Sequence, residues 1–446
     1  MSILIRQARY LIRSADRVER DVDVLIHGRR IAAIGPNLEA ELTTAGKMTV
    51  LDGRARAVMP GLINAHTHLY QCVLRGLHSD LPLEPWLQAV VFPYRRQARL
   101  AYPDEAMMVA ASRAGCAEML KNGTTAFIDM DSTIGAAWRA WQEMGIRGAA
   151  AFNVANAQIP PELVAPLADI QRRVLEQLAE CRALAAETPT LSFMIAAASP
   201  QMCSRPLLEW IAATAEAEGI MIHGHCAETA VEFRETVDET GFTPVGWLAE
   251  AGMLTPHTSL AHCVHVTPAD RALLAEHETI PVHCPKSNMK LASGVSPAPA
   301  MLGAGIAVAL ANDGPASNDL QDMFEEMRFA ALLHKVEGQA DALTAQDAFR
   351  MATEHSARAA GIDAGVLDPG RLADVVLLNL EQPHLAAPGE IVPLLVYCAQ
   401  GRDVDTVIVD GRIVVAGGRL TLADEAEIVE RARRLGAERY RAMTAG

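Results

Sequence analysis

Long hydrophobic runs are missing from this sequence. No stretch of about 18 uncharged apolar residues occurs anywhere in the chain, so no segment is predicted to span a membrane. The first apolar run, Ile3–Ile5, is much shorter than the core of a signal peptide. We therefore expect a cytoplasmic protein that is neither secreted nor bound to a membrane.

Several short disulfide and metal motifs are also absent. The eight cysteines contain no C-x-x-C pair and lie mostly in apolar segments, which predicts reduced core thiols rather than a disulfide framework. Neither the H-E-x-x-H motif of common metalloproteases nor the P-C-x-x-C motif of zinc cytidine deaminases occurs. Their absence excludes both of these zinc sites.

Basic residues are in deficit. The chain has 39 Lys and Arg against 54 Asp and Glu, a net charge of -15, and the acidic residues are scattered. This disfavours a polyanionic partner such as nucleic acid and fits a small neutral or cationic substrate. Hydrophobic residues make up 50% and charged residues 21% of the chain, as in a soluble globular enzyme.

Both ends of the chain are rich in β-forming residues. The segment Asp23–Gly35 has two such runs around a turn that contains glycine, and Val404–Val415 has an Asp-Gly turn between two Val/Ile runs. Because an isolated hairpin is only marginally stable, the simplest arrangement packs both termini together. The sequence therefore predicts a small discontinuous β-sandwich domain from residues 1–58 and 364–446, with a closing helix at Asp424–Met443.

Between these ends, strand-like and helix-like segments alternate. The helix-like segments are amphipathic, as in Asp104–Lys121 and Pro166–Ala186. Eight strand-helix units are expected of an α/β fold of the (β/α)8 TIM barrel type, which we assign to residues 59–363. Functional groups on this fold gather at the carboxyl ends of the strands. The predicted strands are Ala57–Ala65, Thr124–Asp129, Ile146–Val154, Leu191–Ala197, Gly219–His225, Thr258–His262, Thr279–His283 and Ile306–Asn312.

Two histidines one residue apart end the first of these strands. Side chains two residues apart on an extended chain point to the same face, so His66 and His68 can converge on one metal ion. On its own such a pair is weak evidence, because it also occurs as two polar residues at a strand end. The hypothesis requires further ligands at the ends of later strands.

Those later strands supply them. Strand five ends at His225 with Glu228 three residues on, strands six and seven end at His262 and His283, and Asp313 follows strand eight. Asp313 would ligate the metal or share a proton with its water. Glu228 is the residue type that takes a proton from water and passes it to a leaving nitrogen. Such residues at five strand ends together are hard to obtain by chance.

The combined motifs resemble the amidohydrolase superfamily. The branch they are most similar to holds the methylthioadenosine/S-adenosylhomocysteine deaminases, the guanine deaminases and the triazine hydrolases, and the resemblance covers essentially the whole chain. The motifs are His66-x-His68 after Pro60-Gly61, His225-x-x-Glu228, Ala261-His262-Cys263, His283-Cys284-Pro285-x-Ser287-Asn288, Asn312-Asp313-Gly314, and Ala373-Asp374-Val375-Val376 near the end.

The resemblance implies one divalent metal per chain, held by His66, His68, His225 and Asp313. Three imidazoles and a carboxylate suit Zn²⁺, with Fe²⁺ as the alternative because ligand type alone does not select between them. Members with two metals carry a bridging lysine at the end of strand four, and Met194–Pro200 contains none.

The implied catalytic residues are Glu228, His262 and Asp313. Asp313 and His262 would orient and deprotonate a metal-activated water that attacks an aromatic C–N carbon. Glu228 would protonate the ring nitrogen and then help ammonia to leave. His262 would steady the oxygen of the adduct or serve as a loose fifth ligand, and the sequence leaves both roles open.

The motifs specify the substrate less closely. Pro85 stands where methylthioadenosine-type deaminases have a ribose-binding glutamate, and Ala198 where they have a substrate-contacting histidine, which favours a free ring over a nucleoside. The presence of Glu228 favours loss of an amine, which needs a proton, over loss of chloride. The side chains expected to line the substrate pocket are Gln71, Trp86, Gln201, Met202, His283 and Asn288.

We therefore expect a metal-dependent hydrolytic deaminase that releases ammonia from an aminated N-heterocycle of purine, pterin, pyrimidine or s-triazine type. The alternatives are a nucleoside deaminase, a triazine chlorohydrolase or cyclic amidohydrolase, and a non-catalytic binding homologue. The complete ligand set argues against the last, since non-catalytic relatives usually lose ligands. We expect a homo-oligomer, a dimer or a tetramer, with no nucleic-acid or membrane partner.

Overall fold

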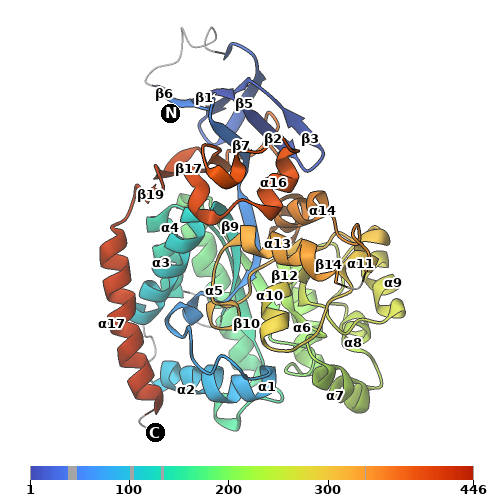
Figure 1. Cartoon of the computed structure of the whole chain (residues 1–446). Helices are drawn as coiled ribbons and strands as arrows, with labels where there is room; N and C mark the ends of the chain where they lie inside the picture. The colour runs from blue at the N-terminus through green and yellow to red at the C-terminus, as the bar shows by residue number, and fades with distance from the viewer. Residues whose placement is uncertain (1, 39–47, 101–104, 132–134, 337, 445–446) are drawn as a thin grey trace.

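The computed structural model describes residues 2–38, 48–100, 105–131, 135–336 and 338–444. A wide barrel carries a narrower β domain at one end, drawn at the top of Figure 1. All eight cysteines are free thiols. None of the described helices combines the length and the apolar character that a membrane span requires.

The barrel is an eight-stranded parallel sheet in which the strands follow one another in sequence order, as the sequence predicts. The strands β8 and β9 are buried along their entire length, as expected where helices cover the outer face of a parallel sheet. The strands are β8 (Leu62–Thr67), β9 (Thr124–Asp131), β10 (Arg147–Val154), β11 (Leu191–Ala197), β12 (Met221–Cys226), β13 (Thr258–His262), β14 (Ile280–His283) and β15 (Ala309–Leu310).

The first and last strands meet at a seam just beyond β15. There the amide of Asp313 donates to the carbonyl oxygen of His66 at 3.0 Å, and the amide of Asn312 donates to Asn64 Oδ1 at 2.9 Å. These bonds close the barrel at its carboxyl end. They also place Asp313 beside the histidines that end β8.

Apolar side chains, many of them alanine, fill the inside of the barrel. Alternate strand residues form an inner cluster, separate from the larger cluster that packs between the strands and the outer helices. The inner cluster includes Ala65 of β8, Ala151 of β10, Ala196 of β11 and Val282 of β14. Because side chains alternate between the two faces of a strand, the neighbours of these residues point toward the helices.

The predicted first strand, Ala57–Ala65, is in fact two strands. β7 (Arg56–Pro60) pairs with the β domain, and β8 continues into the barrel. The change of sheet occurs at Gly61, whose amide donates to the carbonyl oxygen of Asp374 at 3.0 Å. A Cβ atom at Gly61 would lie 2.0 Å from Thr125 Oγ1, so only glycine permits this close approach.

The β domain consists of two sheets that share one apolar core, a β-sandwich built from both termini. That core joins Ile3 and Val24 of one sheet to Val58, Val375 and others of the second. Both predicted hairpins are confirmed, as β4 with β5 and as β17 with β18. The first sheet contains β1 (Ser2–Ala8), β4 (Val22–His27), β5 (Arg30–Gly35) and β6 (Met48–Asp52); the second contains β2 (Tyr10–Ser14), β3 (Arg17–Glu19), β7, β16 (Val375–Asn379), β17 (Val404–Val409), β18 (Arg412–Ala416) and β19 (Arg419–Leu420).

Helices surround the barrel, and the three that the sequence predicts explicitly are present as α3, α5 and α17. Asp104, the predicted first residue of α3, lies outside the described residues. The helices are α1 (Leu83–Trp86), α2 (Phe92–Leu100), α3 (Glu105–Lys121), α4 (Gly135–Met144), α5 (Leu167–Glu187), α6 (Arg205–Glu218), α7 (Ala230–Thr240), α8 (Pro244–Glu250), α9 (Pro268–Glu276), α10 (Pro285–Lys290), α11 (Ala298–Gly303), α12 (Pro315–Asn318), α13 (Met323–Leu333), α14 (Ala345–Arg350), α15 (Ser356–Ala360), α16 (Ile391–Tyr397) and α17 (Glu425–Thr444).

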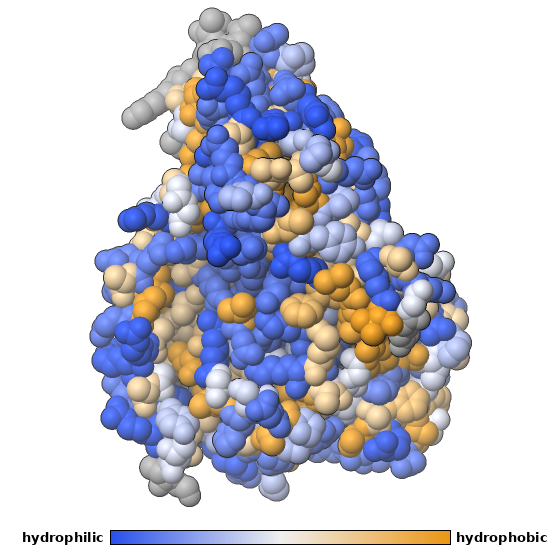
Figure 2. Space-filling model, in the orientation of Figure 1, coloured by the Kyte–Doolittle hydropathy of each residue, from blue (hydrophilic) through white to orange (hydrophobic). Residues whose placement is uncertain are grey.

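Two helical segments mark the outline of the barrel. α17 runs down its side and packs against α3 and α2, while α1 and α2 lie at the end far from the β domain (Figure 1). Because α1 and α2 lie at the end of the barrel far from the β domain, they lie over the carboxyl ends of the strands, where the fold is expected to hold its functional groups. The face of the molecule drawn in Figure 2 is largely hydrophilic, with apolar residues in small groups.

A buried ion pair joins the barrel to the β domain. The guanidinium of Arg147, the first residue of β10, donates to both carboxylate oxygens of Asp374 at 2.8 and 3.1 Å and to Asp410 Oδ1 at 3.0 Å. We expect Arg147→Met to lower the free energy of unfolding by about 3 to 5 kcal/mol, because it leaves the buried carboxylate of Asp374 without an opposite charge, while Asp410 keeps its ion pair with Arg29. Denaturant unfolding measures the change. The matched control, Arg172→Met in an exposed pair, should change it by less than about 1 kcal/mol; equal losses would contradict the assignment.

A second buried carboxylate makes stability depend on pH. Glu326 of α13 accepts a hydrogen bond from Asn318 Nδ2 through one oxygen, and among the described residues its other oxygen has no partner. Burial raises the pKa of Glu326 from 4.5 to about 8. Between these values the folded chain holds a proton that the unfolded chain has released, so rising pH lowers stability through this window.

The variant Glu326→Gln removes this titration. Relative to the wild type, its free energy of unfolding should rise by about 2 to 4 kcal/mol from pH 4.5 to pH 8 and stay level above that. Denaturant unfolding of both proteins across this range measures the difference. A difference that does not change with pH would contradict the proposed titration.

Candidate metal centre and active site

Five side chains from four strand ends meet at the carboxyl end of the barrel. The metal-ligating atoms of His66, His68 and His225 all lie within 4.8 Å of one another, and so do those of His66, His262 and Asp313. His66 and His68 come from the end of β8, His225 and His262 from β12 and β13, and Asp313 from beyond β15. The structure thus brings together the residues that the sequence proposes as metal ligands.

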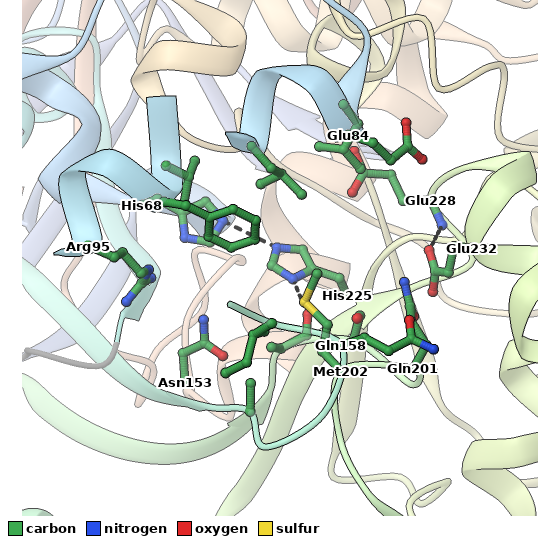
Figure 3. Close-up of a pocket in the computed structure, with 18 of the residues that line it drawn as sticks. His68, Glu84, Arg95, Asn153, Gln158, Gln201, Met202, His225, Glu228 and Glu232 are labelled. Carbon is green, nitrogen blue, oxygen red and sulfur yellow. Dashed lines mark hydrogen bonds between the residues drawn. The ribbon is translucent and has the colours of Figure 1, made fainter. Parts of the chain in front are cut away.

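Buried acceptors set the orientation of the imidazoles. His68 Nδ1 donates to the carbonyl oxygen of Met130 at 2.6 Å, and His225 Nδ1 donates to that of Ala198 at 2.5 Å. With Nδ1 protonated and engaged, the lone pair lies on Nε2 of each ring. The two Nε2 atoms are 3.2 Å apart and face the same point (Figure 3).

His66 is oriented by another histidine, which the sequence analysis did not single out as functional. His66 Nδ1 is 2.8 Å from His223 Nε2, and His223 Nδ1 is 2.7 Å from Ser259 Oγ. These two hydrogen bonds hold the His66 ring so that its Nε2 atom faces the centre. The signal was present in the sequence, because His223 and His225 are two residues apart on one strand and therefore share a face.

Hydroxyl groups orient the candidate carboxylate ligand. Ser287 Oγ and Ser317 Oγ both donate to Asp313 Oδ2, at 2.5 and 2.8 Å. The other oxygen, Oδ1, lies 3.3 Å from His66 Nε2 and 3.5 Å from His68 Nε2. One oxygen of Asp313 is therefore anchored and the other is presented to the imidazoles.

These donors fit a divalent metal. His66 Nε2 is fully buried and, among the described residues, has no hydrogen-bond partner. Burial lowers the pKa of His66, His68 and His225, so the rings are neutral near pH 7, the form in which imidazole binds a metal. Three neutral imidazoles and a carboxylate oxygen around one point form a metal site of the kind seen in metal-dependent hydrolases.

Glu228 and His262 stand beside this centre. Glu228 Oε2 is 3.6 Å from His262 Nε2, and Glu228 Oε1 accepts a hydrogen bond from Ser293 Oγ at 3.3 Å. Burial raises the pKa of Glu228 to about 7. Burial alone would lower the pKa of His262, but the carboxylates of Glu228 and Asp313 outweigh it and raise that pKa. Near neutral pH the pair can therefore both hold and release protons.

Asn288, expected to line the substrate pocket, has a different position. Its Oδ1 is 2.9 Å from His262 Nδ1, and it does not contribute to the cavity wall. An asparagine oxygen can only accept, so His262 donates from Nδ1 and presents Nε2 to Glu228. Asn288 therefore orients His262.

His283 is also displaced from the expected pocket. Its neighbour Val282 belongs to the inner cluster, so alternation along β14 directs His283 outward. Its Nε2 lies 3.4 Å from His334 Nε2 at the end of α13. His283, predicted as a substrate contact, is therefore not among the residues that line the cavity at the centre.

A cavity of about 640 Å³ opens onto the centre. Four expected residues line it, namely Gln71, Trp86, Gln201 and Met202. Ala198 is also part of the wall, whereas Pro85 is not.

The cavity includes polar residues that the sequence analysis did not assign to it. Figure 3 shows Glu84 and Glu232 near Glu228, and Arg95 and Asn153 on the other side of His68. Arg95 Nη1 pairs with Asp131 Oδ1 at 3.2 Å. No local motif marks these residues, because they come from α1, α2, α7 and β10, which are brought together only by folding.

Comparison with known proteins agrees with this geometry. The amidohydrolase family model matches residues 57–414. The 5'-deoxyadenosine deaminase of Methanothermobacter thermautotrophicus is 40% identical over 93% of this chain and 94% of its own length. The crystal structure of an adenosine deaminase from Xanthomonas campestris with bound zinc has a TM-score of 0.90, 29% identity, and covers 98% of both chains.

A third protein has related architecture with a different reaction. A variant of the atrazine chlorohydrolase TrzN from Arthrobacter aurescens, in complex with zinc and atraton, superposes with a TM-score of 0.89 at 26% identity. The match covers 97% of this chain and 100% of that one. Fold, site geometry and these similarities together show that the chain belongs to the amidohydrolase family, as a hydrolase of C–N bonds other than peptide bonds.

Proposed function

We propose that this deaminase removes the amino group of a 6-aminopurine ring that is carried on a nucleoside, and releases it as ammonia. One observation carries the proposal: a protonatable carboxylate, Glu228, stands beside a converging set of three imidazoles and Asp313 at the base of a large cavity. The names of the similar proteins, a 5'-deoxyadenosine deaminase and an adenosine deaminase, support it.

The proposed metal is zinc, held by His66, His68, His225 and Asp313. The ligand set suits Zn²⁺, and the similar adenosine deaminase contains bound zinc. Fe²⁺ is the alternative occupant. Such a metal supplies Lewis acidity that lets water act as a nucleophile near neutral pH.

Glu228 is the proposed proton carrier. Its pKa of about 7 allows it to accept a proton from the attacking water and then donate one to the ring nitrogen. Ser293 holds Oε1, which leaves Oε2 free to face the reacting atoms. The second proton of that water, lost from the hydroxyl group of the adduct as the carbonyl forms, passes to the amino group, which then leaves as ammonia.

His262 and Asp313 assist the same reaction. Asn288 keeps the Nε2 atom of His262 directed into the site, where it can hydrogen-bond to the oxygen that develops negative charge. Asp313 Oδ1, with its partner oxygen anchored by two serines, can orient the attacking water.

The cavity supports a nucleoside over a bare ring. Its volume of about 640 Å³ lies in the range of pockets that enclose ligands much larger than a purine base. The sequence departs from the nucleoside pattern at Pro85, but the adjacent Glu84 lines the cavity and can supply the carboxylate. Ala198 is in the wall as well, and its carbonyl oxygen orients His225.

Chloride displacement is the second candidate, favoured by the similarity to the atrazine chlorohydrolase. Chloride needs no proton to leave, whereas an amine does. A carboxylate whose pKa is raised to about 7 can supply that proton, so Glu228 favours deamination over loss of chloride.

We also propose, from the sequence, that the protein works in the cytoplasm as a homo-oligomer.

Ammonia release from metal-quantified protein tests the function. The panel contains adenosine, 5'-deoxyadenosine, methylthioadenosine, adenine, guanine, a pterin, cytosine, melamine and a chlorinated triazine. We expect turnover of the adenine nucleosides, about one zinc per chain, and loss of activity after chelation that added zinc restores. Turnover of free bases alone would overturn the nucleoside assignment, and chloride release alone would overturn deamination.

The variant Glu228→Gln tests the proton carrier. We expect it to keep its metal and lose activity by at least about a hundredfold, because an amide cannot transfer the proton. Steady-state ammonia release and metal content are measured on the same preparation. Glu276→Gln, an exposed carboxylate on α9, is the charge-matched control and should retain activity. Near-normal turnover by Glu228→Gln would remove Glu228 from the mechanism.

A further inference from the structure

Glu232 of α7 is a buried carboxylate that the proposed chemistry does not use. Its Oε1 accepts a hydrogen bond from the amide of Ala227 at 2.9 Å, and its Oε2 accepts one from the amide of Glu228 at 2.7 Å. Figure 3 shows the second bond, with Glu232 directly beside Glu228. Two consecutive amides thus donate to one carboxylate. Hydrogen bonds to a charged group are strong, and a pair of them also fixes the relative orientation of the carboxylate and the backbone.

This arrangement goes beyond the capping of a helix. In α9 and α14 the carboxylate of the third helical residue returns to the amide of the N-cap residue, Thr267 or Thr344. In α7 the N-cap is Thr229, and the Glu232 carboxylate reaches further back, to the two residues before it. Those two residues form the turn that carries Glu228 out of β12.

The turn needs such support. Ala227 has φ of +53°, a left-handed conformation that is unfavourable for a residue with a Cβ. The segment after β13 holds the carbonyl oxygens: Cys226 accepts from the amide of Cys263 at 3.0 Å, and Ala227 accepts from the amide of Val264 at 3.0 Å. Glu232 holds the amides, so the turn is fixed from both sides.

The backbone amide of Glu232 also links the turn to the wall of the cavity. The Glu232 amide donates to Thr229 Oγ1 at 3.1 Å, and Thr229 Oγ1 donates to Glu84 Oε1 at 2.8 Å. Glu84 belongs to α1, which lies over the carboxyl ends of the strands. The wall over the substrate and the loop that bears Glu228 are therefore connected through one threonine.

We propose that Glu232 is a positioning residue that sets the direction of the Glu228 carboxylate for proton transfer. The inference rests on the proposed function, because it assigns to Glu232 the alignment of that function's proton carrier. Small misalignment of a proton carrier is costly, since a shift of about 1 Å can reduce the rate about a hundredfold. Glu232 acts through the backbone of the turn and transfers no proton itself.

The variant Glu232→Gln tests the proposal. An amide has one accepting oxygen, so one of the two backbone bonds is lost while the side-chain volume is kept. With adenosine and 5'-deoxyadenosine as substrates, we expect kcat to fall about 10- to 100-fold while KM changes by less than about threefold. Metal content should match the wild type. A crystal structure of the variant should show Glu228 Oε2 displaced from His262 Nε2, which are 3.6 Å apart in the wild type.

Asp238→Asn is the matched control, an exposed acid on the same helix. It should retain the wild-type kcat, KM and position of Glu228. Glu232→Gln with a lowered melting temperature but normal kcat would reduce Glu232 to a stabilising cap and overturn the proposal. A fall in kcat with Glu228 unmoved would overturn it as well. Absence of ammonia release by the wild-type protein would instead show that the proposed function has failed.

Discussion

The candidate centre depends on the hydrogen-bonded seam that closes the barrel. The bond from the Asp313 amide to the carbonyl oxygen of His66 joins the last strand end to the first. These two residues are far apart in the chain, yet their side chains must approach the same point. Closure also brings β12 and β13 into the positions from which His225 and His262 reach it. Without the seam the barrel would have two free edges and the donors would not converge.

At this site the residues that follow the strands have strained backbone conformations, which hydrogen bonds to neighbouring segments stabilise. Ala227, His262, Cys263 and Asp313 all have positive φ. Non-glycine residues in this conformation persist only where the surrounding structure determines them, and they cluster at functional sites. Here the bracing comes from bonds between neighbouring strand ends and from Glu232.

Burial then determines the chemistry of these side chains. It keeps the three imidazoles neutral and therefore able to bind a metal, and it raises the pKa of Glu228 toward neutrality. Each group is also held by a partner that leaves only one atom free: Met130 and Ala198 for two imidazoles, and the pair of serines for Asp313. Orientation and protonation are thus set by the same buried surroundings. A metal ion and a substrate meet groups that need little rearrangement.

The sequence by itself determined the barrel, the terminal β domain and the residues of the centre, because strand periodicity and the ends of parallel strands are local features that one fold brings together. His66, His68, His225, Glu228, His262 and Asp313 could be named for this reason. Only the tertiary structure decided what the other polar residues do. It split the first predicted strand at Gly61, where Thr125 leaves no room for a side chain, and it turned His283 outward by alternation along β14. It also made Asn288 a support for His262 and placed Glu84, Arg95 and Glu232 at the cavity, because contacts between distant segments follow from packing and leave no periodic signal in the chain.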